Sequence, residues 1–176
     1  MTYNNNLRFN LIKFRNNLDD NTIINKSNIM FNYIINHRQY KNNNIIYLYN
    51  SYNNELLTDK LIDYSLNNDK IICLPVCVNN NLKFIKINKN TKYIKNKYHI
   101  NEPEYSKDLI IDSSGLMIIP IISSYNNYRL GYGKGYYDRY LKNRKYIYTI
   151  GVGYDFQNKQ FEINTTDIQL NEIKLF

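Results

Sequence analysis

The sequence predicts an α/β protein in which helices pack on a parallel sheet. Strand-like apolar runs alternate with segments of helical periodicity along the chain, as expected of strands joined by crossover helices. The run 116–122 is apolar throughout, which is typical of a central strand covered on both faces. The length of 176 residues suits one domain with a hydrophobic core, so we expect a single domain over 1–176.

The first part of the chain predicts three helices and one strand. Residues 7–18 have helical spacing, and their apolar stripe consists of Leu7, Leu11, Ile12, Phe14 and Leu18. A second helix should follow, with Ser27 as its N-cap and apolar residues over 29–34. The β-rich run 45–49 predicts a strand that ends in the polar turn 50–54, and 58–66 returns to helical spacing.

The second part predicts more strands and one more helix. Strands are expected over 70–78, 82–87, 116–122 and 146–152. A loop is expected over 98–103, the segment 123–128 is polar, and a helix should run from Tyr136 to Lys142.

Composition narrows the classes of function. The net charge of +8 suits anionic small molecules as well as nucleic acid, and the lysines are scattered rather than clustered. Cys73 and Cys77 lie in an apolar run without a nearby Cys or His cluster, so we interpret them as small hydrophobic residues of a protein in a reducing compartment. No apolar run approaches the roughly 18 residues of a membrane span, and we expect a cytoplasmic protein.

The segment from Arg129 to Asp138 is the strongest candidate for chemistry. It holds three of the six glycines of the chain at alternate positions. Glycine permits positive φ and lets backbone N–H groups converge on an anion. Arg129 and Lys134 add positive charge, the start of a helix adds further donors, and Asp138 lies where a carboxylate can hold Mg²⁺ against phosphate groups.

Two familiar phosphate loops do not describe this segment. It is not a Walker A loop, because no Ser or Thr follows Gly133-Lys134, and it is not the dinucleotide fingerprint, because the third glycine comes too early. The alternative is a glycine turn that only reverses the chain. Two cations and an acid are more than such a turn requires, so phosphate binding is the better interpretation.

The longer phrase 128–141, Tyr-Arg-Leu-Gly-Tyr-Gly-Lys-Gly-Tyr-Tyr-Asp-Arg-Tyr-Leu, resembles the signature of the 5-formyltetrahydrofolate cyclo-ligase family, also called methenyltetrahydrofolate synthetases. Supporting phrases follow in the family's order over nearly the whole chain. They are Leu7-Arg8, Glu55-Leu-Leu-Thr58, Leu74-Pro75, Ile100-Asn-Glu-Pro103, Ile118-Ile-Pro120, Gln157 and Asp167. The resemblance implies a three-layer α/β sandwich around a mainly parallel sheet.

The resemblance also implies an ATP- and Mg²⁺-dependent ligase. Such enzymes phosphorylate the formyl oxygen of 5-formyltetrahydrofolate, and the neighbouring folate nitrogen then attacks the activated carbon. The products are 5,10-methenyltetrahydrofolate, ADP and phosphate. Little covalent chemistry falls to the protein, so positioning and charge neutralisation should dominate catalysis.

Roles follow for individual residues by their match to the family. The resemblance places Asp138 and Asp167 on Mg²⁺ and assigns catalytic roles to Glu55, Lys134 and Tyr137. ATP should be bound by Arg8, Arg129, Leu130, Gly131, Tyr132, Gly133, Lys134, Gly135, Tyr136 and Tyr137. The folate, with or without a polyglutamate tail, should contact Glu55, Tyr132, Gly133, Lys134, Gly135 and Tyr136. A monomer or weak homodimer is expected, with neither nucleic acid nor membrane as partner.

The chain departs from the family pattern at several positions. Asn4 stands where the family has a lysine, so one phosphate contact is lost or is supplied by Lys13. The other departures are Gly115 for an aspartate, Ser124 and Tyr125 for a Phe-Asp pair, Glu162 for a proline and Asn171 for an acid.

Three other interpretations remain open. A decayed family member would bind nucleotide or folate without turnover. A basic nucleic-acid-binding domain would use some of the 19 tyrosines for base stacking, although Tyr47, Tyr49, Tyr146 and Tyr148 fall in apolar strands, where we expect them to pack. A phosphate-binding α/β enzyme outside the family would share the glycine loop without pairing it with Glu55.

Overall fold

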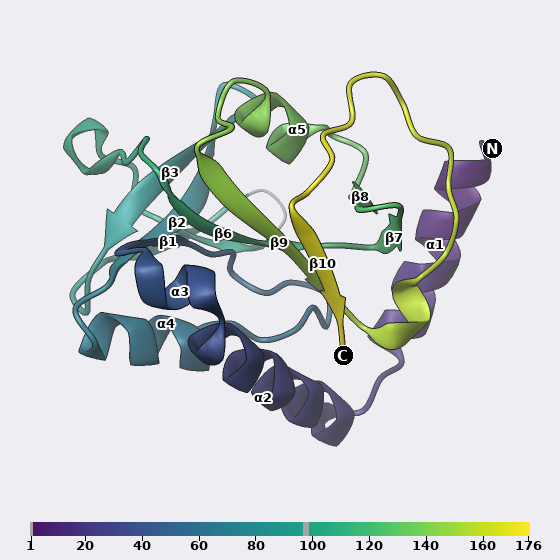
Figure 1. Cartoon of the computed structure of the whole chain (residues 1–176), viewed down its shortest axis with the longest axis horizontal. Helices are drawn as coiled ribbons and strands as arrows, with labels where there is room; N and C mark the ends of the chain where they lie inside the picture. Colours follow the sequence, from purple (N-terminus) through teal and green to yellow (C-terminus); the bar gives the residue numbers. More distant parts are fainter. Residues whose placement is uncertain (1, 97–98) are drawn as a thin grey trace.

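The computed structural model describes residues 2–96 and 99–176, and a six-stranded sheet forms its centre (Figure 1). Its strands are β1 (Ile45–Tyr47), β2 (Ile71–Val78), β3 (Asn81–Ile87), β6 (Gly115–Pro120), β9 (Ile147–Gly153) and β10 (Glu172–Leu175). They lie in the order β10-β9-β6-β1-β2-β3. Every neighbouring pair is parallel except β2 and β3. The expected mainly parallel sheet is thereby confirmed.

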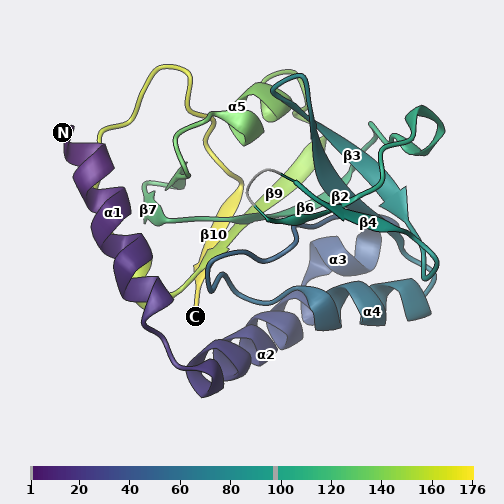
Figure 2. The ribbon, with the colours of Figure 1, turned by 180° about the vertical axis from the view of Figure 1, so that it is seen from behind.

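Helices cover both faces of this sheet. They are α1 (Tyr3–Asn16), α2 (Asp20–Asn36), α3 (Arg38–Asn42), α4 (Asp59–Asn67) and α5 (Tyr136–Leu141). Helices α2, α3 and α4 lie on one face and α5 lies on the other (Figures 1 and 2). Helix α1 stands apart from these layers, beside β7 and the segment between β9 and β10. The arrangement confirms the α/β class and the layering of helices on the sheet.

Shorter elements decorate the main sheet. Two antiparallel pairs form, β4 (Tyr93–Lys95) with β5 (Asn101–Pro103), and β7 (Ser123–Tyr125) with β8 (Tyr128–Leu130). Single 3₁₀ turns occupy Lys107–Leu109 and Asp155–Gln157. The loop expected over 98–103 is therefore wrong for 101–103, while Tyr98 lies outside the described residues. The polar segment 123–128 is a hairpin, closed by Asn126 and Asn127 with positive φ.

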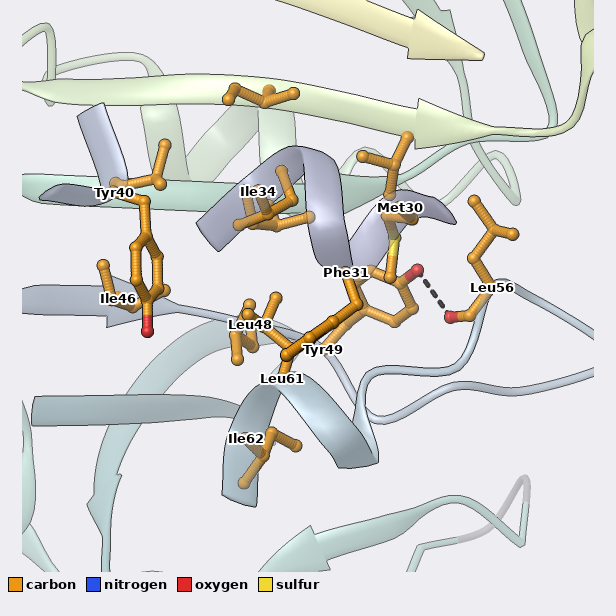
Figure 3. Close-up of a cluster of buried hydrophobic side chains, with 14 of the residues drawn as sticks. Met30, Phe31, Ile34, Tyr40, Ile46, Leu48, Tyr49, Leu56, Leu61 and Ile62 are labelled. Atoms are coloured by element: carbon orange, nitrogen blue, oxygen red, sulfur yellow. Dashed lines mark hydrogen bonds between the residues drawn. The ribbon is translucent and has the colours of Figure 1, made fainter. Parts of the chain in front are cut away.

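Alternating side chains of the central strands fill two separate cores. In β6, Leu116 and Ile118 face the helices α2 to α4, whereas Met117 and Ile119 face α5. All four are fully buried, which explains the uninterrupted apolar run. The larger core gathers Met30, Ile34 and Leu61 around the first strand, and the hydroxyl of Tyr49 donates to the carbonyl of Leu56 at its end (Figure 3).

Helix α2 starts earlier than its sequence suggested. Asp19 is its N-cap and accepts a hydrogen bond from the amide of Thr22 at 2.9 Å, so the expected cap at Ser27 is wrong. Ser27 is buried inside the helix, where its hydroxyl donates to the carbonyl of Ile23 and accepts from the amide of Leu57. A serine satisfied in this way suits a helix interior, and the cap preference of serine was misleading.

The inner face of α1 is polar. Its buried residues are Asn4, Leu11 and Arg15, whereas Phe14 is 56% exposed. The apolar stripe predicted for this helix is therefore wrong in part. The helix contacts the glycine segment and the 160s rather than the apolar core.

Burial of the strand tyrosines and cysteines follows the sequence only in part. Tyr47, Tyr49 and Cys73 are buried as expected, and both cysteines are free thiols. Tyr146, in contrast, precedes β9 and is exposed, with its hydroxyl on Asp112. None of the helices in the described part of the chain combines the length and apolarity needed to cross a bilayer.

We predict that Gly115→Ala lowers the free energy of unfolding by about 1 to 3 kcal/mol, the usual cost of overpacking. A Cβ at this position would lie 2.5 Å from the carbonyl oxygen of Ile45 in β1, so the two central strands would have to separate. Urea unfolding measures the effect. The exposed neighbour Ser114→Ala is the control and should change stability by less than about 0.5 kcal/mol. Equal stability of the two variants would refute the steric explanation.

Candidate active site

The centre of the sheet has a topological switch point. Neighbouring strands β1 and β6 are parallel, but the chain leaves β1 through α4 towards β2 and leaves β6 through α5 towards β9. The two connections therefore diverge on opposite faces. Ligands of open α/β sheets bind in the crevice that forms outside the carboxyl ends of such strands. Here the segment 48–58 follows β1, and the hairpin β7–β8 with the glycine segment follows β6.

A cavity of about 250 Å³ opens beside the glycine segment. The structure brings together at this cavity the segment 129–138, Arg8 from α1 and Asp167 from the loop before β10. The remaining lining residues are Pro120, Asn164 and Thr166. The glycine segment starts from β8, not directly from the central strand, because the hairpin intervenes.

The glycines of the segment bring two arginines close to its backbone. Gly133 and Gly135 have φ of +87° and +61°, a conformation that other residues rarely adopt. A Cβ on Gly133 would lie 3.4 Å from the guanidinium carbon of Arg8, and one on Gly131 would collide with the guanidinium of Arg129. Arg8 also donates from Nε to the carbonyl of Gly131 at 2.7 Å. The missing side chains thus allow positive charge to lie against the loop.

Arg129 is buried beside the cavity. Its Nη2 donates to Oδ2 of Asp138 at 2.8 Å, and its guanidinium lies over the ring of Tyr137 at 5.0 Å from the centroid. Its Nε is buried and has no hydrogen-bond partner among the described residues. A buried donor without a partner is costly. An anion bound in this cavity would lie next to the positive charge of Arg129 and would be attracted to it.

Two carboxylates line the same cavity. Oδ1 of Asp138 accepts from the amide of Ile168 at 3.2 Å, and Oδ2 of Asp167 accepts from the amide of Asn164 at 2.8 Å. The described residues contain no group of three or more His, Cys, Asp or Glu side chains placed to hold a metal ion. Mg²⁺ commonly needs only one or two carboxylates, with waters and substrate phosphates completing its shell. The donor set therefore fits Mg²⁺ that arrives with a nucleotide.

Lys134 and Tyr136 form the outer part of the segment. The side chain of Lys134 is exposed. Arg139 fixes the backbone here, since its Nη1 donates to the carbonyl of Lys134 at 2.7 Å while its guanidinium lies 5.3 Å from the centre of the Tyr136 ring. The cationic side chain of Lys134 remains available to an anionic ligand.

Glu55 lies behind the cavity in a crevice too narrow for water, which Pro120 also lines. The carboxylate is 5% exposed and accepts hydrogen bonds from the amide of Tyr52 at 3.1 Å and the hydroxyl of Tyr132 at 3.2 Å. Burial raises the pKa of Glu55 to about 7, although Arg15 opposes this rise. A carboxylate with such a pKa can exchange a proton near neutral pH.

Tyr132 joins Glu55 to the glycine segment. Its ring is partly exposed, but its hydroxyl lies between Oε1 of Glu55 and Nη2 of Arg15, the latter at 2.5 Å. Burial raises the pKa of Tyr132 well above its ordinary value, so this hydroxyl keeps its proton. The structure thus brings together the acidic residue after β1 and the glycine segment, as the sequence predicted.

Arg15 is a site residue that the sequence predictions missed. It is 1% exposed and lies 3.9 Å from Oε1 of Glu55. A signal was present, because Arg8 and Arg15 are seven residues apart and so share one face of a helix. The family match assigns a role to Arg8 and none to Arg15.

Asn4 does not take the place of a phosphate-binding lysine. Its side-chain amide donates to the carbonyl of Glu162 at 2.8 Å and its Oδ1 accepts from the amide of Glu162 at 3.0 Å. Two departures from the family pattern therefore contact each other and tie α1 to the loop that carries Asp167. Lys13 is exposed and is not among the described residues lining the cavity.

Comparison with known proteins identifies relatives of this chain. A model of the 5-formyltetrahydrofolate cyclo-ligase family matches residues 1–175. A 5-formyltetrahydrofolate cyclo-ligase of Mycoplasma genitalium is 35% identical over 130 residues, which cover 72% of this chain and 68% of that protein. The protein of the same name from Escherichia coli K12 is 31% identical over 116 residues, covering 62% and 63%.

Two solved structures share the fold. A 5,10-methenyltetrahydrofolate synthetase of Aquifex aeolicus superposes with a TM-score of 0.84 over 98% of this chain and 89% of its own, at 23% identity. A synthetase of the same kind from Mycoplasma pneumoniae gives 0.76 over 98% of both chains, at 25% identity. The family match over almost the whole chain, together with its similarity to the Mycoplasma genitalium protein, shows that this chain belongs to the 5-formyltetrahydrofolate cyclo-ligase family.

Proposed function

We propose that this protein converts 5-formyltetrahydrofolate to 5,10-methenyltetrahydrofolate, using ATP with Mg²⁺ and releasing ADP and phosphate. One observation carries the proposal. The cationic glycine segment and a buried carboxylate with a pKa near 7 are joined at the switch point of the sheet through Tyr132. Phosphorylation requires a phosphate-binding site, and the ring closure that follows requires a proton acceptor beside it.

The glycine segment is suited to the phosphate groups of ATP. Arg8 and Arg129 bring two guanidinium groups to one cavity, and Lys134 adds an ammonium group. The start of α5 at Gly135 adds backbone N–H groups. The residues proposed to contact ATP are Arg8, Arg129, Leu130, Gly131, Tyr132, Gly133, Lys134, Gly135, Tyr136 and Tyr137. Asp138 and Asp167 are proposed to hold Mg²⁺, which would neutralise phosphate charge when bound.

The chemistry solves a leaving-group problem. The formyl oxygen of the substrate is a poor leaving group until the γ-phosphoryl group of ATP is transferred to it, with departure of ADP. The neighbouring folate nitrogen then attacks the formyl carbon, a carbon–nitrogen bond forms and the carbon–oxygen bond breaks. Phosphate leaves with the oxygen, and the attacking nitrogen gives up its proton.

Glu55 is proposed to accept that proton. Its carboxylate is held by the amide of Tyr52 and the hydroxyl of Tyr132, and its pKa of about 7 matches the task. The folate would contact Glu55 and the part of the segment from Tyr132 to Tyr136. The hydroxyl of Tyr132 is hydrogen-bonded to Glu55 in this structure. The side chain of Tyr132 must therefore move before the folate can contact Glu55.

Lys134 and Tyr137 have supporting catalytic roles in the proposal. The ammonium group of Lys134 would neutralise charge on the transferred phosphoryl group. Burial raises the pKa of Tyr137 well above its ordinary value, so its hydroxyl remains a neutral donor. Its ring also supports the guanidinium of Arg129 from below.

The proposal extends to the cellular location, the oligomeric state and the partners of the enzyme. We propose a cytoplasmic location, which agrees with the free thiols of Cys73 and Cys77, and we propose that the enzyme is a monomer or weak homodimer. 5-Formyltetrahydrofolate, with or without a polyglutamate tail, would be its partner, and we propose no role for nucleic acid or a membrane.

The first test follows the absorbance of the methenyl product after the protein is mixed with 5-formyltetrahydrofolate, Mg²⁺ and ATP. We predict a signal that requires ATP and is lost in Asp138→Asn and in Gly135→Val, since a branched residue cannot adopt φ +61° without strain. The exposed Lys145→Gln is the control and should retain activity. Thermal unfolding separates loss of activity from loss of fold. Binding of ATP without any conversion by the unaltered protein would instead indicate a decayed family member.

The second test concerns Glu55. We predict that kcat rises as pH increases through about 7, because the carboxylate must be ionised to accept a proton. In Glu55→Gln, kcat should fall by about 10²- to 10⁴-fold, the usual contribution of a general base. Calorimetric affinity for a non-hydrolysable ATP analogue should be almost unchanged in this variant. A defect confined to nucleotide affinity would contradict the assignment.

A further inference from the structure

Arg15 is a fully buried cation with contacts to three residues in two separate segments. Its Nε donates to the carbonyl of Asn53 in the turn before Glu55, at 2.8 Å. Its Nη2 donates to the hydroxyl of Tyr132 in the glycine segment, and its Nη1 lies 3.9 Å from Oε1 of Glu55. One side chain of α1 thus joins the proposed phosphate site to the proposed proton acceptor.

This arrangement is unusual for a stabilising contact. Removing a guanidinium and a carboxylate from water costs more than their attraction commonly returns. The pair here is not in direct bidentate contact, since the hydroxyl of Tyr132 lies between the two groups. Replacing both members of such a pair by apolar residues is often neutral or stabilising, whereas removing one member leaves a buried charge uncompensated.

We propose that Arg15 is a positioning residue that holds Glu55 as a carboxylate, in register with the glycine segment, for proton acceptance from the folate. The inference rests on the proposed role of Glu55. Arg15 acts through Glu55 and Tyr132, and it does not itself touch the reacting atoms. Its planar guanidinium is suited to donating to two acceptors in fixed directions while its charge lies near Glu55.

Arg15 is the principal cation near Glu55 among the described residues. The other titratable groups that influence Glu55, or are influenced by it, are hydroxyls from several elements packed around it. They are Tyr49 after β1, Tyr132 of the glycine segment, Tyr137 of α5 and Tyr154 after β9. Burial raises the pKa of each of these tyrosines, so all remain uncharged near neutral pH. Loss of Arg15 would leave the Glu55 carboxylate without its cation.

The test compares Arg15→Gln and Arg15→Lys with the unaltered protein. Two readouts are used, the pH dependence of kcat and a ¹³C NMR titration of the Glu55 carboxyl, whose signal is assigned by its disappearance in Glu55→Gln. In Arg15→Gln we expect both midpoints to rise by about 1 to 3 pH units, the usual effect of removing an opposite charge at this distance. Added guanidinium ion should restore part of the activity.

The matched control is Arg144→Gln. Arg144 also pairs with a carboxylate, Asp112, at 2.6 Å, but this pair lies away from the glycine segment. Its loss should alter stability without moving either midpoint. A folded Arg15→Gln protein with unaltered midpoints would overturn the proposal.

Arg15→Lys keeps the test decisive if the glutamine variant does not fold. Lysine retains the positive charge but lacks the rigid, planar set of donors of the guanidinium group. We therefore expect kcat to fall at least about tenfold while KM for ATP is unchanged. Unchanged kcat in a folded Arg15→Lys protein would refute the positioning role.

The NMR titration needs no turnover. An inactive protein whose Glu55 midpoint still responds to Arg15 would therefore refute the proposed function and leave the coupling between these two residues intact.

Discussion

The parallel pairing of β1 with β6 places two unrelated segments at one edge of the sheet. Because the chain diverges from these strands in opposite directions, no crossover helix covers the space above their carboxyl ends. The turn with Glu55 and the segment with the glycines both enter this space. If β6 paired elsewhere, the carboxylate and the phosphate loop would be separated by the width of a strand or more, and α1 would have no polar surface to cover. Side chains of β1 and β6 contribute to the cores on both faces of the sheet.

The site contains buried charged side chains that are not required to stabilise the fold. Arg15, Arg129 and Glu55 are all nearly inaccessible to water, although each would be better solvated at the surface. Tyrosines with raised pKa surround them and contribute fixed dipoles without charge. Groups ordered in this way before a ligand arrives need little reorganisation during the reaction, which is the main source of electrostatic catalysis. The polar inner face of α1 belongs to the same arrangement.

Patterns that report burial or backbone geometry were readable from the sequence. The continuous run of β6 predicted a central strand. The alternating glycines predicted a loop in which positive φ is permitted, and Gly133 and Gly135 adopt it. The helix α1 was misread because a helix that faces a polar site lacks an apolar stripe of the usual kind. Strands β7, β8 and β10 are too short and polar to show periodicity, since tertiary pairing rather than local preference defines them. The contact between Asn4 and Glu162 depends on residues 158 positions apart and has no local signal.

The central claim is that the phosphate loop delivers a phosphoryl group to the formyl oxygen. It can be tested with 5-formyltetrahydrofolate labelled with ¹⁸O at that oxygen, by mass analysis of the phosphate released during one turnover. If the oxygen is phosphorylated before the ring closes, the label must leave in the inorganic phosphate. Unlabelled phosphate, with the label recovered in water, would contradict the account.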